Sequence, residues 1–334
     1  MPRQNKILSI VTPGIFYAGI DIGKNDCWVA PQAGRRRRFA FSLEGVEAMA
    51  GWLRELSNEG GVIRCAMEHT GVYSIAWAAL IESCGLQCAL LNPTRVKQYG
   101  QSSGQRSKTD KADCASILSA AMHWQAPARQ PAPAAQARLA LLLSHYRFLK
   151  KQRAALLNRI HAIGHLPEHG ELLLPALEEM LTSFDQAIAQ GRKQIRELID
   201  LDDQLAPADK LLRSIPSIGE YSSAVLLVHH DKLRTATASQ LTALFGLAPQ
   251  HKQSGSSVHG KSHIDKQGNA VVRNSLYMCA LSGGTYNPRL AEVRTRLKAD
   301  GKPPKVVLVA LSRHLLRIAR SVIHSGRPFE YKPA

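Results

Sequence analysis

The sequence predicts an α/β domain at the N-terminus, a helical middle region and a mainly helical C-terminal domain. Short apolar runs alternate with helix-like periodicity over about the first 125 residues. A proline-rich joint, Ala126 to Pro133, then leads into leucines and isoleucines spaced three to four residues apart. A length of 334 residues suits roughly two domains, and 45% hydrophobic residues are enough for sizeable cores. We place the boundaries at residues 1–126, 127–205 and 206–334.

The first region contains three strand-like segments followed by alternating helix and strand signals. The expected strands are Phe16–Ile22, Asp26–Ala30, Arg38–Ser42, Val62–Met67 and Gln87–Leu91, and the expected helices are Glu44–Leu56, Tyr73–Cys84 and Lys108–His123. This is the element order of the ribonuclease H-like (RuvC-like) fold, which we expect here, although many α/β domains begin with a similar order.

The middle region carries two apolar stripes at helical spacing, from Leu139 to Ile163 and from Leu177 to Leu198. The stripes predict two long amphipathic helices joined near Pro167. Such helices form either an antiparallel hairpin or a coiled-coil dimer surface. We therefore expect this region to serve in interactions rather than in catalysis.

The charge distribution favours a polyanionic partner. The chain has 43 Lys+Arg against 26 Asp+Glu, a formal charge of +17, and residues 250–334 alone hold 15 Lys/Arg against four acids. Such an enrichment of cations is typical of proteins that bind nucleic acid. An acidic membrane surface is the weaker alternative, because the sequence shows no basic amphipathic helix. No apolar run approaches the roughly 20 residues of a membrane span. The lack of a full secretion signal and of any Cys-x-x-Cys pair predicts a cytoplasmic protein with reduced thiols.

Four carboxylates stand where they could form a metal site. Asp21 lies within an apolar strand, where burial is costly without a counter-charge, and Glu68 ends another predicted strand. Asp110 and Asp113 are spaced to share one helical face. These positions converge in the ribonuclease H-like arrangement, and oxygen-only ligands suit Mg²⁺. Two such ions could stabilise both the attacking and the leaving oxygen of a phosphodiester displacement. Each acid alone could have an ordinary structural role, such as helix capping by Asp110, but the four acids together favour a metal site.

The segment Ser214 to Glu220, followed by the apolar run Tyr221–Val228, is typical of a helix–hairpin–helix. Its turn contains Ser217 and Gly219 directly before a helix N-terminus. Backbone N–H groups at such a place can hold a DNA phosphate without reading the sequence. An ordinary helical turn is the alternative.

The glycine- and serine-rich loop at residues 251–261 could carry a nucleophile for a phosphate, although a polar surface loop explains it equally well. Nothing in the residues themselves selects one among its serines Ser254, Ser256 and Ser257. Cations that could contact phosphate, or lie in solvent, are Arg106, Lys108, Lys252, Lys261 and Arg273.

The sequence resembles the DEDD transposases of bacterial insertion sequences in the IS110 family, the bridge-RNA-guided serine recombinases. The matching segments follow the family order from about residue 17 to about residue 330. They are GIDIGK around Asp21, EHTGVY around Glu68, LNP at Leu91 to Pro93, KTDKAD at Lys108 to Asp113, SIPSIGEYSSAVLL, LFGLAPQ, SGSSVHGK and GNAVVRNSLYM. Single segments are weak signals, and the ordered series is specific.

The resemblance implies a RuvC-like domain whose four acids Asp21, Glu68, Asp110 and Asp113 bind Mg²⁺. It implies a C-terminal transposase domain whose nucleophile is the first serine of SGSS, Ser254. Target and donor DNA would be cleaved and exchanged through a phosphoserine intermediate, with a structured guide (bridge) RNA supplying sequence choice. A homodimer assembling to a homotetramer would form the composite site. His69 stands where family members have threonine or alanine, and the four acids are unaffected.

Three other functions fit parts of the sequence. A RuvC-like junction-resolving nuclease with water as nucleophile would share the acids without needing Ser254. An actin-like sugar kinase would need a second Asp-x-Gly phosphate loop, and Asp21 to Gly23 is the only one. A non-catalytic DNA- or RNA-binding protein would leave the four acids unexplained.

Overall fold

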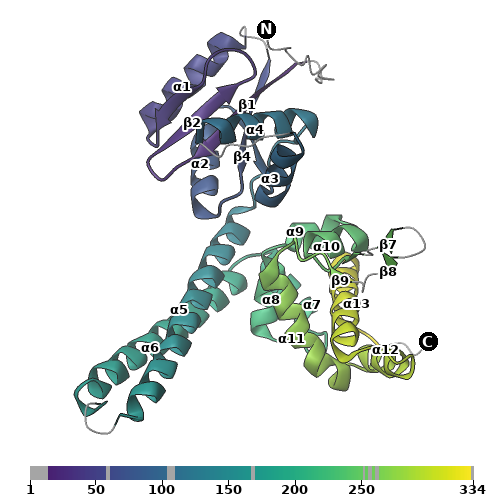
Figure 1. The fold of residues 1–334 in the computed structure, drawn as a ribbon. Helices are drawn as coiled ribbons and strands as arrows, with labels where there is room; N and C mark the ends of the chain where they lie inside the picture. The colour runs from purple at the N-terminus through teal and green to yellow at the C-terminus, as the bar shows by residue number, and fades with distance from the viewer. Residues whose placement is uncertain are drawn as a thin grey trace. The chain divides into compact units, whose positions relative to one another are not determined.

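The computed structural model describes residues 14–57, 61–103, 110–166, 170–250, 253–254, 258–259 and 263–331 (Figure 1). Side chains are not described for residues 110–112, for residue 171 or for the two short segments at 253–254 and 258–259. The chain divides into two compact units, residues 1–131 (unit 1) and residues 132–334 (unit 2). Each unit is described on its own.

Unit 1 is a five-stranded mixed sheet with helices on both faces. The strand order is β3-β2-β1-β4-β5, in which β1, β4 and β5 are parallel and β2 and β3 are antiparallel to their neighbours. The strands are β1 (Ile15–Ile22), β2 (Asp26–Pro31), β3 (Arg37–Ala40), β4 (Val62–Glu68) and β5 (Gln87–Leu91), and the helices are α1 (Leu43–Leu56), α2 (Val72–Ser83), α3 (Pro93–Ser102) and α4 (Asp110–His123). The predicted N-terminal α/β domain is thereby confirmed.

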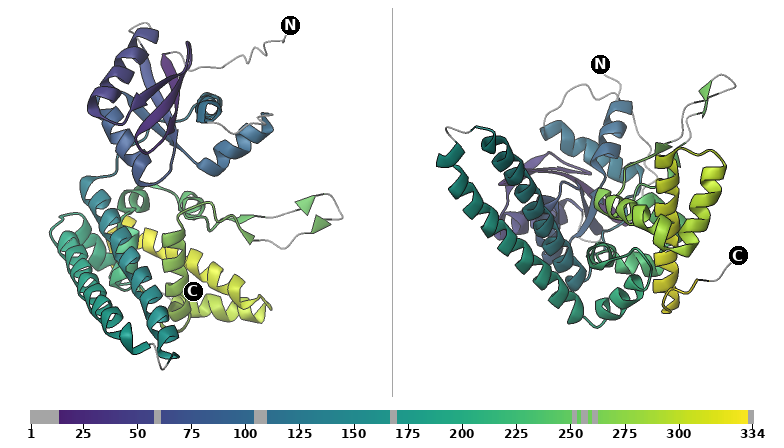
Figure 2. Two further views of the ribbon diagram at one scale, coloured as in Figure 1. Left: turned by 60° about the vertical axis from the view of Figure 1, so that its left-hand side comes forward. Right: turned by 90° about the horizontal axis from the view of Figure 1, so that it is seen from below.

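The alternation of side chains along the strands separates two cores. Ile20 of β1 and Met67 of β4 pack with Trp77 of α2 on one face of the sheet. Tyr17 of β1 packs with Ile117 of α4 on the other. Helices α1 and α2 therefore cover one face and α3 and α4 the opposite one, as Figure 2 shows.

Helix α3 was not predicted. Asn92 caps its N-terminus, because its side-chain oxygen accepts hydrogen bonds from the backbone N–H groups of Thr94 at 2.9 Å and Arg95 at 3.3 Å. Pro93 occupies the first helical position, where the missing N–H costs nothing. The Asn-Pro pair that follows β5 is therefore also the start of a helix.

Unit 2 is mainly helical. Its helices are α5 (Ala134–Gly164), a short 3₁₀ helix (Gly170–Leu172), α6 (Leu174–Asp200), α7 (Leu205–Arg213), α8 (Glu220–Leu227), α9 (His230–Thr235), α10 (Ala238–Leu244), α11 (Ala270–Tyr286), α12 (Pro288–Ala299) and α13 (Pro304–Ser325). Two short antiparallel pairs join β6 (Pro249–Gln250) to β9 (His263–Ile264) and β7 (Gln253–Ser254) to β8 (Val258–His259).

The two long helices α5 and α6 pack against each other along the stripes that predicted them (Figure 1). One core contains Leu139 of α5, Ile195 of α6 and Leu315 of α13. The helical hairpin therefore shares its core with the C-terminal helices.

None of the six cysteines is part of a disulfide. Burial raises the pKa of Cys27 and of Cys88 to about 12 in each case, so neither thiol ionises near neutral pH. Within the described part of the chain, no helix combines the length and apolar character that crossing a membrane requires.

Candidate active site

Asp21 and Glu68 lie on neighbouring parallel strands at the carboxyl end of the sheet. The register of β1 and β4 pairs Ile20 with Met67, and the next pair in this register is Asp21 and Glu68. Ala66, two residues before Glu68, packs in the core between the sheet and α4, so Glu68 points to the same face. Since neighbouring strands are about 4.8 Å apart, the two carboxylates start from adjacent positions.

Helix α4 crosses this face in very close contact with β1. A Cβ added to Gly19 would lie 2.3 Å from the carbonyl oxygen of Cys114 and 2.4 Å from the backbone nitrogen of Leu118. No side chain fits at that position, so glycine is what allows the helix to lie so near the strand. Asp113 directly precedes Cys114, and Asp110 is the first residue of α4. The close approach thus brings Asp113 to the face that carries the two strand acids.

The electrostatics of Cys114 connect Asp21 with this helix. Burial raises the pKa of the Cys114 thiol, the Arg36 cation lowers it, and the Asp21 carboxylate raises it further. Asp21 also raises the pKa of Cys27 on β2, where burial is the largest cause. The Asp21 carboxylate therefore acts electrostatically on the residue that follows Asp113.

The turn after Glu68 is held by several hydrogen bonds. The backbone N–H of His69 donates to the carbonyl of Leu91 at 2.9 Å. The Ser74 hydroxyl donates to the carbonyl of Gly71 at 2.8 Å and lies 3.1 Å from Nδ1 of His69, which donates to it in the matching tautomer. Gly71 has φ 79° and ψ −134°, a conformation that essentially requires glycine. Sequence reasoning did not single out Gly19 or Gly71, although a glycine inside a strand signals close backbone approach.

The side chains that could hold a divalent cation offer only carboxylate oxygens, which fits Mg²⁺ rather than a thiolate- or imidazole-binding metal. Three of the four acids, Asp21, Glu68 and Asp113, have described side chains. Among the described side chains, a set that does not include that of Asp110, no group of three His, Cys, Asp or Glu residues could hold a metal ion.

Ser254 is the last residue of β7 and pairs with Val258 of β8. In Figure 2, β7 and β8 extend away from the helices of unit 2. The β6–β9 pair lies between them and the helices α10 and α11. The side chain of Ser254 lies outside the described residues, as do Ser256, Ser257, Arg106, Lys108, Lys252 and Lys261.

The predicted hairpin lies between α7 and α8. Gly219 is the N-cap of α8 with φ −91°, and the positive φ of 85° belongs to Ser217. The Ser217 hydroxyl is buried and has no hydrogen-bond partner among the residues that the structure describes. A Cβ on Gly283 of α11 would lie 2.7 Å from it, so this hydroxyl faces the core. The Ser217 side chain is therefore not placed to hold a phosphate, and that role falls to backbone N–H groups of the hairpin.

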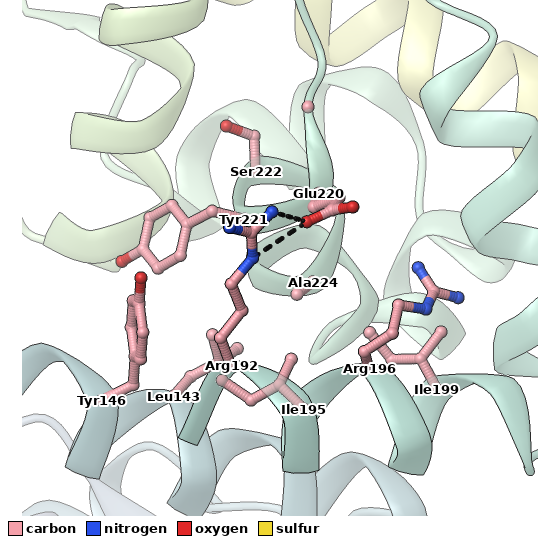
Figure 3. A pocket seen from close by; sticks show the side chains of 11 residues that line it. Leu143, Tyr146, Arg192, Ile195, Arg196, Ile199, Glu220, Tyr221, Ser222 and Ala224 are labelled. Atoms are coloured by element: carbon pink, nitrogen blue, oxygen red, sulfur yellow. Dashed lines mark hydrogen bonds and ion pairs between the residues drawn. The ribbon is translucent and has the colours of Figure 1, made fainter. Parts of the chain in front are cut away.

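A pocket of about 410 Å³ lies at the N-terminal end of α8 (Figure 3). Within it, the Glu220 carboxylate accepts hydrogen bonds from Arg192 Nη2 at 2.6 Å and Nε at 3.2 Å. The Arg192 guanidinium lowers the pKa of Glu220. A carboxylate thus already lies at the electropositive end of α8, and a phosphate there would have to compete with it.

Arg273, in the first turn of α11, has a structural role. Its Nη1 donates to the carbonyl of Phe245 at 3.1 Å and to that of Gly268 at 3.4 Å. These bonds tie α11 to the end of α10 at the point where the chain leaves for β6 and returns from β9.

Comparisons with known proteins give a consistent result. Residues 18–168 match a family described as "Transposase", and residues 209–294 match one described as "Transposase IS116/IS110/IS902 family". The first match includes all four acids and the second includes Ser254.

Similar proteins extend over nearly the whole chain. The pilin gene-inverting protein of Moraxella bovis is 29% identical over 320 residues, which cover 94% of this chain and 97% of that protein. The pilin gene-inverting protein of Moraxella lacunata is 28% identical with the same coverage. The insertion element IS110 uncharacterized 43.6 kDa protein of Streptomyces coelicolor is 28% identical over 161 residues, 48% of this chain and 38% of that protein.

Proposed function

Because the chain belongs to the IS110 family of transposases and is a DNA-recombining enzyme, we propose that it cuts and exchanges DNA strands through a phosphoserine intermediate on Ser254. The observation that carries this proposal is the close approach of α4 to Gly19, with acids from β1, β4 and α4 on one face. We propose that this face is the RuvC-like half of a composite active site formed between subunits. The β7–β8 segment that bears Ser254, which we call the arm, is the other half.

The chemistry assigned to Ser254 is a transesterification. Its Oγ attacks a backbone phosphorus, an Oγ–P bond forms, and the bond from phosphorus to the leaving strand oxygen breaks. The serine proton passes to a basic acceptor, and the leaving oxygen takes up a proton. A hydroxyl of the partner strand then attacks the phosphoserine and releases Ser254, so no phosphodiester bond is lost to water.

Asp21, Glu68, Asp110 and Asp113 would hold Mg²⁺, which when bound neutralises charge on the phosphate and stabilises the leaving oxygen. The protein's own contribution is to fix these acids on a rigid sheet and helix. Gly19 and the turn at Gly71 do this through packing and hydrogen bonds. Water-mediated hydrolysis, as in a junction-resolving nuclease, is the alternative use of the same acids.

We further propose that target and donor DNA are selected by a structured guide (bridge) RNA and that the active species is a homotetramer built from homodimers in the cytoplasm. The excess of 15 Lys/Arg over four acids in residues 250–334 suits binding of two polyanions. Leu141 and Phe148 on α5 are 66% and 54% exposed, which supports a dimer surface along that helix.

Inversion of a DNA segment is a second candidate outcome of the same chemistry. It is supported by the pilin gene-inverting proteins, which match this chain over 94% of its length. Strand exchange between two sites in opposite orientation on one molecule inverts the DNA between them, whereas exchange between two molecules joins them. One plasmid with two inverted sites, analysed by restriction mapping, separates the two outcomes.

A covalent-adduct assay tests the mechanism. The protein, its element's RNA and end-labelled target and donor DNA are incubated with Mg²⁺ and then denatured. We expect a protein–DNA adduct that is lost in Ser254→Ala and in Asp21→Ala and that requires the divalent cation. Ser256→Ala and Ser257→Ala are the matched controls and should retain the adduct.

Two results would contradict the mechanism. If the adduct were lost in Ser256→Ala or Ser257→Ala and retained in Ser254→Ala, the nucleophile would be that other serine and not Ser254. Cleavage without an adduct that persists in Ser254→Ala and is lost in Asp21→Ala would establish the hydrolytic nuclease instead.

A further inference from the structure

A second pocket in unit 2, of about 700 Å³, lies beside the base of the serine-bearing arm. One wall is the β6–β9 pair, through Pro249 and Ile264, and the others are α11 and α13. A volume of this size is in the range of sites that hold one small organic ligand. It therefore suits a small organic group rather than a helix.

The lining of this pocket, which we call the arm pocket, combines apolar residues with cations. The apolar residues are Leu247, Pro249, Ile264, Ala270, Val306, Val309 and Ala310, and the cations are Lys266, Arg273, Lys305 and Arg313. Tyr277 adds an aromatic ring, and no acidic residue belongs to the lining. The chemistry is that of a receptor for a ligand with an apolar body and a negative charge.

Arg313 is a partly buried cation in the lining of the arm pocket. Its Nε is buried and makes no hydrogen bond with any part of the chain that the structure describes. Burial lowers the pKa of this guanidinium, and the neighbouring Arg317 cation lowers it further. Partial burial of a cation is costly, and an anion beside the guanidinium would offset that cost.

The position of the pocket relates it to the reactive serine. Ser254 follows the pocket residue Pro249 by five residues, so chain length alone limits their Cα separation to about 17 Å. Bases in a stacked strand rise by about 3.4 Å each. A strand of about five stacked nucleotides is therefore long enough to join a base in the arm pocket to the phosphate that Ser254 would attack.

We propose that the arm pocket takes up one nucleobase that has been unstacked from its strand, with the adjoining phosphate held by Lys305 and Arg313. The base would lie against Val309, Ile264 and the Tyr277 ring. A flat base with an attached phosphate is the nucleic-acid unit that matches both halves of the lining. The inference rests on the proposed function, because it assumes that the strand belongs to the recombination complex. The strand is a nucleic acid, either DNA or the guide RNA.

Methyl groups in the pocket make a direct test possible. The full chain is labelled with ¹³C at Ile, Leu and Val methyls and titrated with a single-stranded DNA tetramer and with a tetramer of abasic deoxyribose phosphates. We expect upfield ring-current shifts at Ile264, Val306 and Val309 with the intact tetramer only. The abasic tetramer should bind about 10-fold more weakly or worse, since stacking of one base contributes about 1–3 kcal/mol. An RNA tetramer of the same bases shows which strand is preferred.

Variants distinguish specific binding in the arm pocket from general electrostatic attraction of DNA to a basic surface. Lys305→Gln and Arg313→Gln should each weaken binding of the DNA tetramer about 10-fold, while Lys298→Gln on exposed α12 should change it less than about 2-fold. Methyl signals of α5 should be unchanged in all three and report an intact fold. Equal shifts with intact and abasic tetramers, or equal weakening by Lys298→Gln and Lys305→Gln, would overturn the proposal. The readout needs no cleavage, so its failure is distinct from failure of the phosphoserine mechanism.

Discussion

Gly19 of β1 and Cys114 of α4 approach so closely that a Cβ on the glycine would lie 2.3 Å from the cysteine's carbonyl oxygen. Gly19→Ala must therefore displace α4 from the sheet, and with it Asp113. We expect strand cleavage to fall about 100-fold, because a misplacement of about 1 Å in a catalytic group has that effect. Adduct formation under single-turnover conditions measures it.

The control for this change is Gly51→Ala in α1, where an added Cβ meets nothing within 4 Å. Alanine is the better helix former by about 1 kcal/mol, so this variant should be slightly more stable and fully active. Full activity of Gly19→Ala would show that the acids tolerate movement of α4.

Ser217→Gly should stabilise unit 2 by about 1 kcal/mol. The residue has φ 85°, which is unfavourable for any side chain, and its buried hydroxyl has no hydrogen-bond partner within the described ranges of the chain. Chemical unfolding followed by far-UV circular dichroism measures the gain, and DNA affinity should stay within about 2-fold. Weaker DNA binding by Ser217→Gly would mean that the hydroxyl contacts phosphate after all.

Ser214→Gly is the matched control, because this hydroxyl has partners. It donates to the carbonyl of Leu211 at 2.6 Å and accepts from the backbone N–H of Phe329 at 2.8 Å. Removing it should lower stability by about 1 kcal/mol, the opposite sign to Ser217→Gly.

Asp209 joins three helices of unit 2 through a buried carboxylate that is 1% exposed. It accepts a hydrogen bond from Arg196 Nη1 at 2.7 Å and one from the Ser223 hydroxyl at 2.6 Å. Asp209→Ala should destabilise unit 2 by about 1–3 kcal/mol, because the buried Ser223 hydroxyl loses its acceptor and Arg196 loses one of its two carboxylate partners. Asp200→Ala removes a fully exposed partner of the same arginine and should have little effect; equal losses in the two variants would show that burial is not what matters.

The stability of unit 2 should depend on the protonation of His229. Burial lowers the pKa of this imidazole from 6.5 to about 4, and the neighbouring Lys232 cation contributes. The unfolded chain therefore binds a proton in this range that the folded chain lacks. The stabilisation is complete above about pH 6.5 and is lost as the pH falls towards 4, by at most about 3 kcal/mol.

His229→Gln tests this dependence. The amide nitrogen of Asn269 lies 3.1 Å from Nε2 of His229 and can only donate, so the ring accepts in its neutral form. Glutamine keeps an acceptor and does not titrate. Urea midpoints from pH 4 to 7 should fall less steeply in the variant, and parallel curves for the two proteins would assign the pH dependence to other groups.

The strands β1, β4 and β5 could be predicted because their apolar runs are buried from both sides of the sheet, which leaves a strong signal. Helix α3 could not, because its sequence is polar and its start depends on a cap that also resembles a strand end. The four acids were proposed as metal ligands from residue type, spacing and their positions in the predicted strands and helix, and that role stays a prediction.

What the sequence could not reveal is how neighbouring elements pack. The position of Asp113 against the sheet depends on the missing side chain of Gly19, a feature that is visible only once α4 is placed. The core-facing direction of the Ser217 hydroxyl likewise depends on Gly283, 66 residues further along the chain. The arm pocket draws its walls from β6, β9, α11 and α13, which are separated in sequence, so no local pattern could predict it.

The division into two compact units determines what a spectroscopic probe can report. All four tryptophans, Trp28, Trp52, Trp77 and Trp124, belong to unit 1, whereas the long helices that dominate far-UV circular dichroism belong to unit 2. Tryptophan emission and ellipticity therefore follow different halves of the molecule, and their melting curves need not coincide. A single melting temperature for the chain would then average two events, and a substitution in one half can leave the other half's signal unmoved.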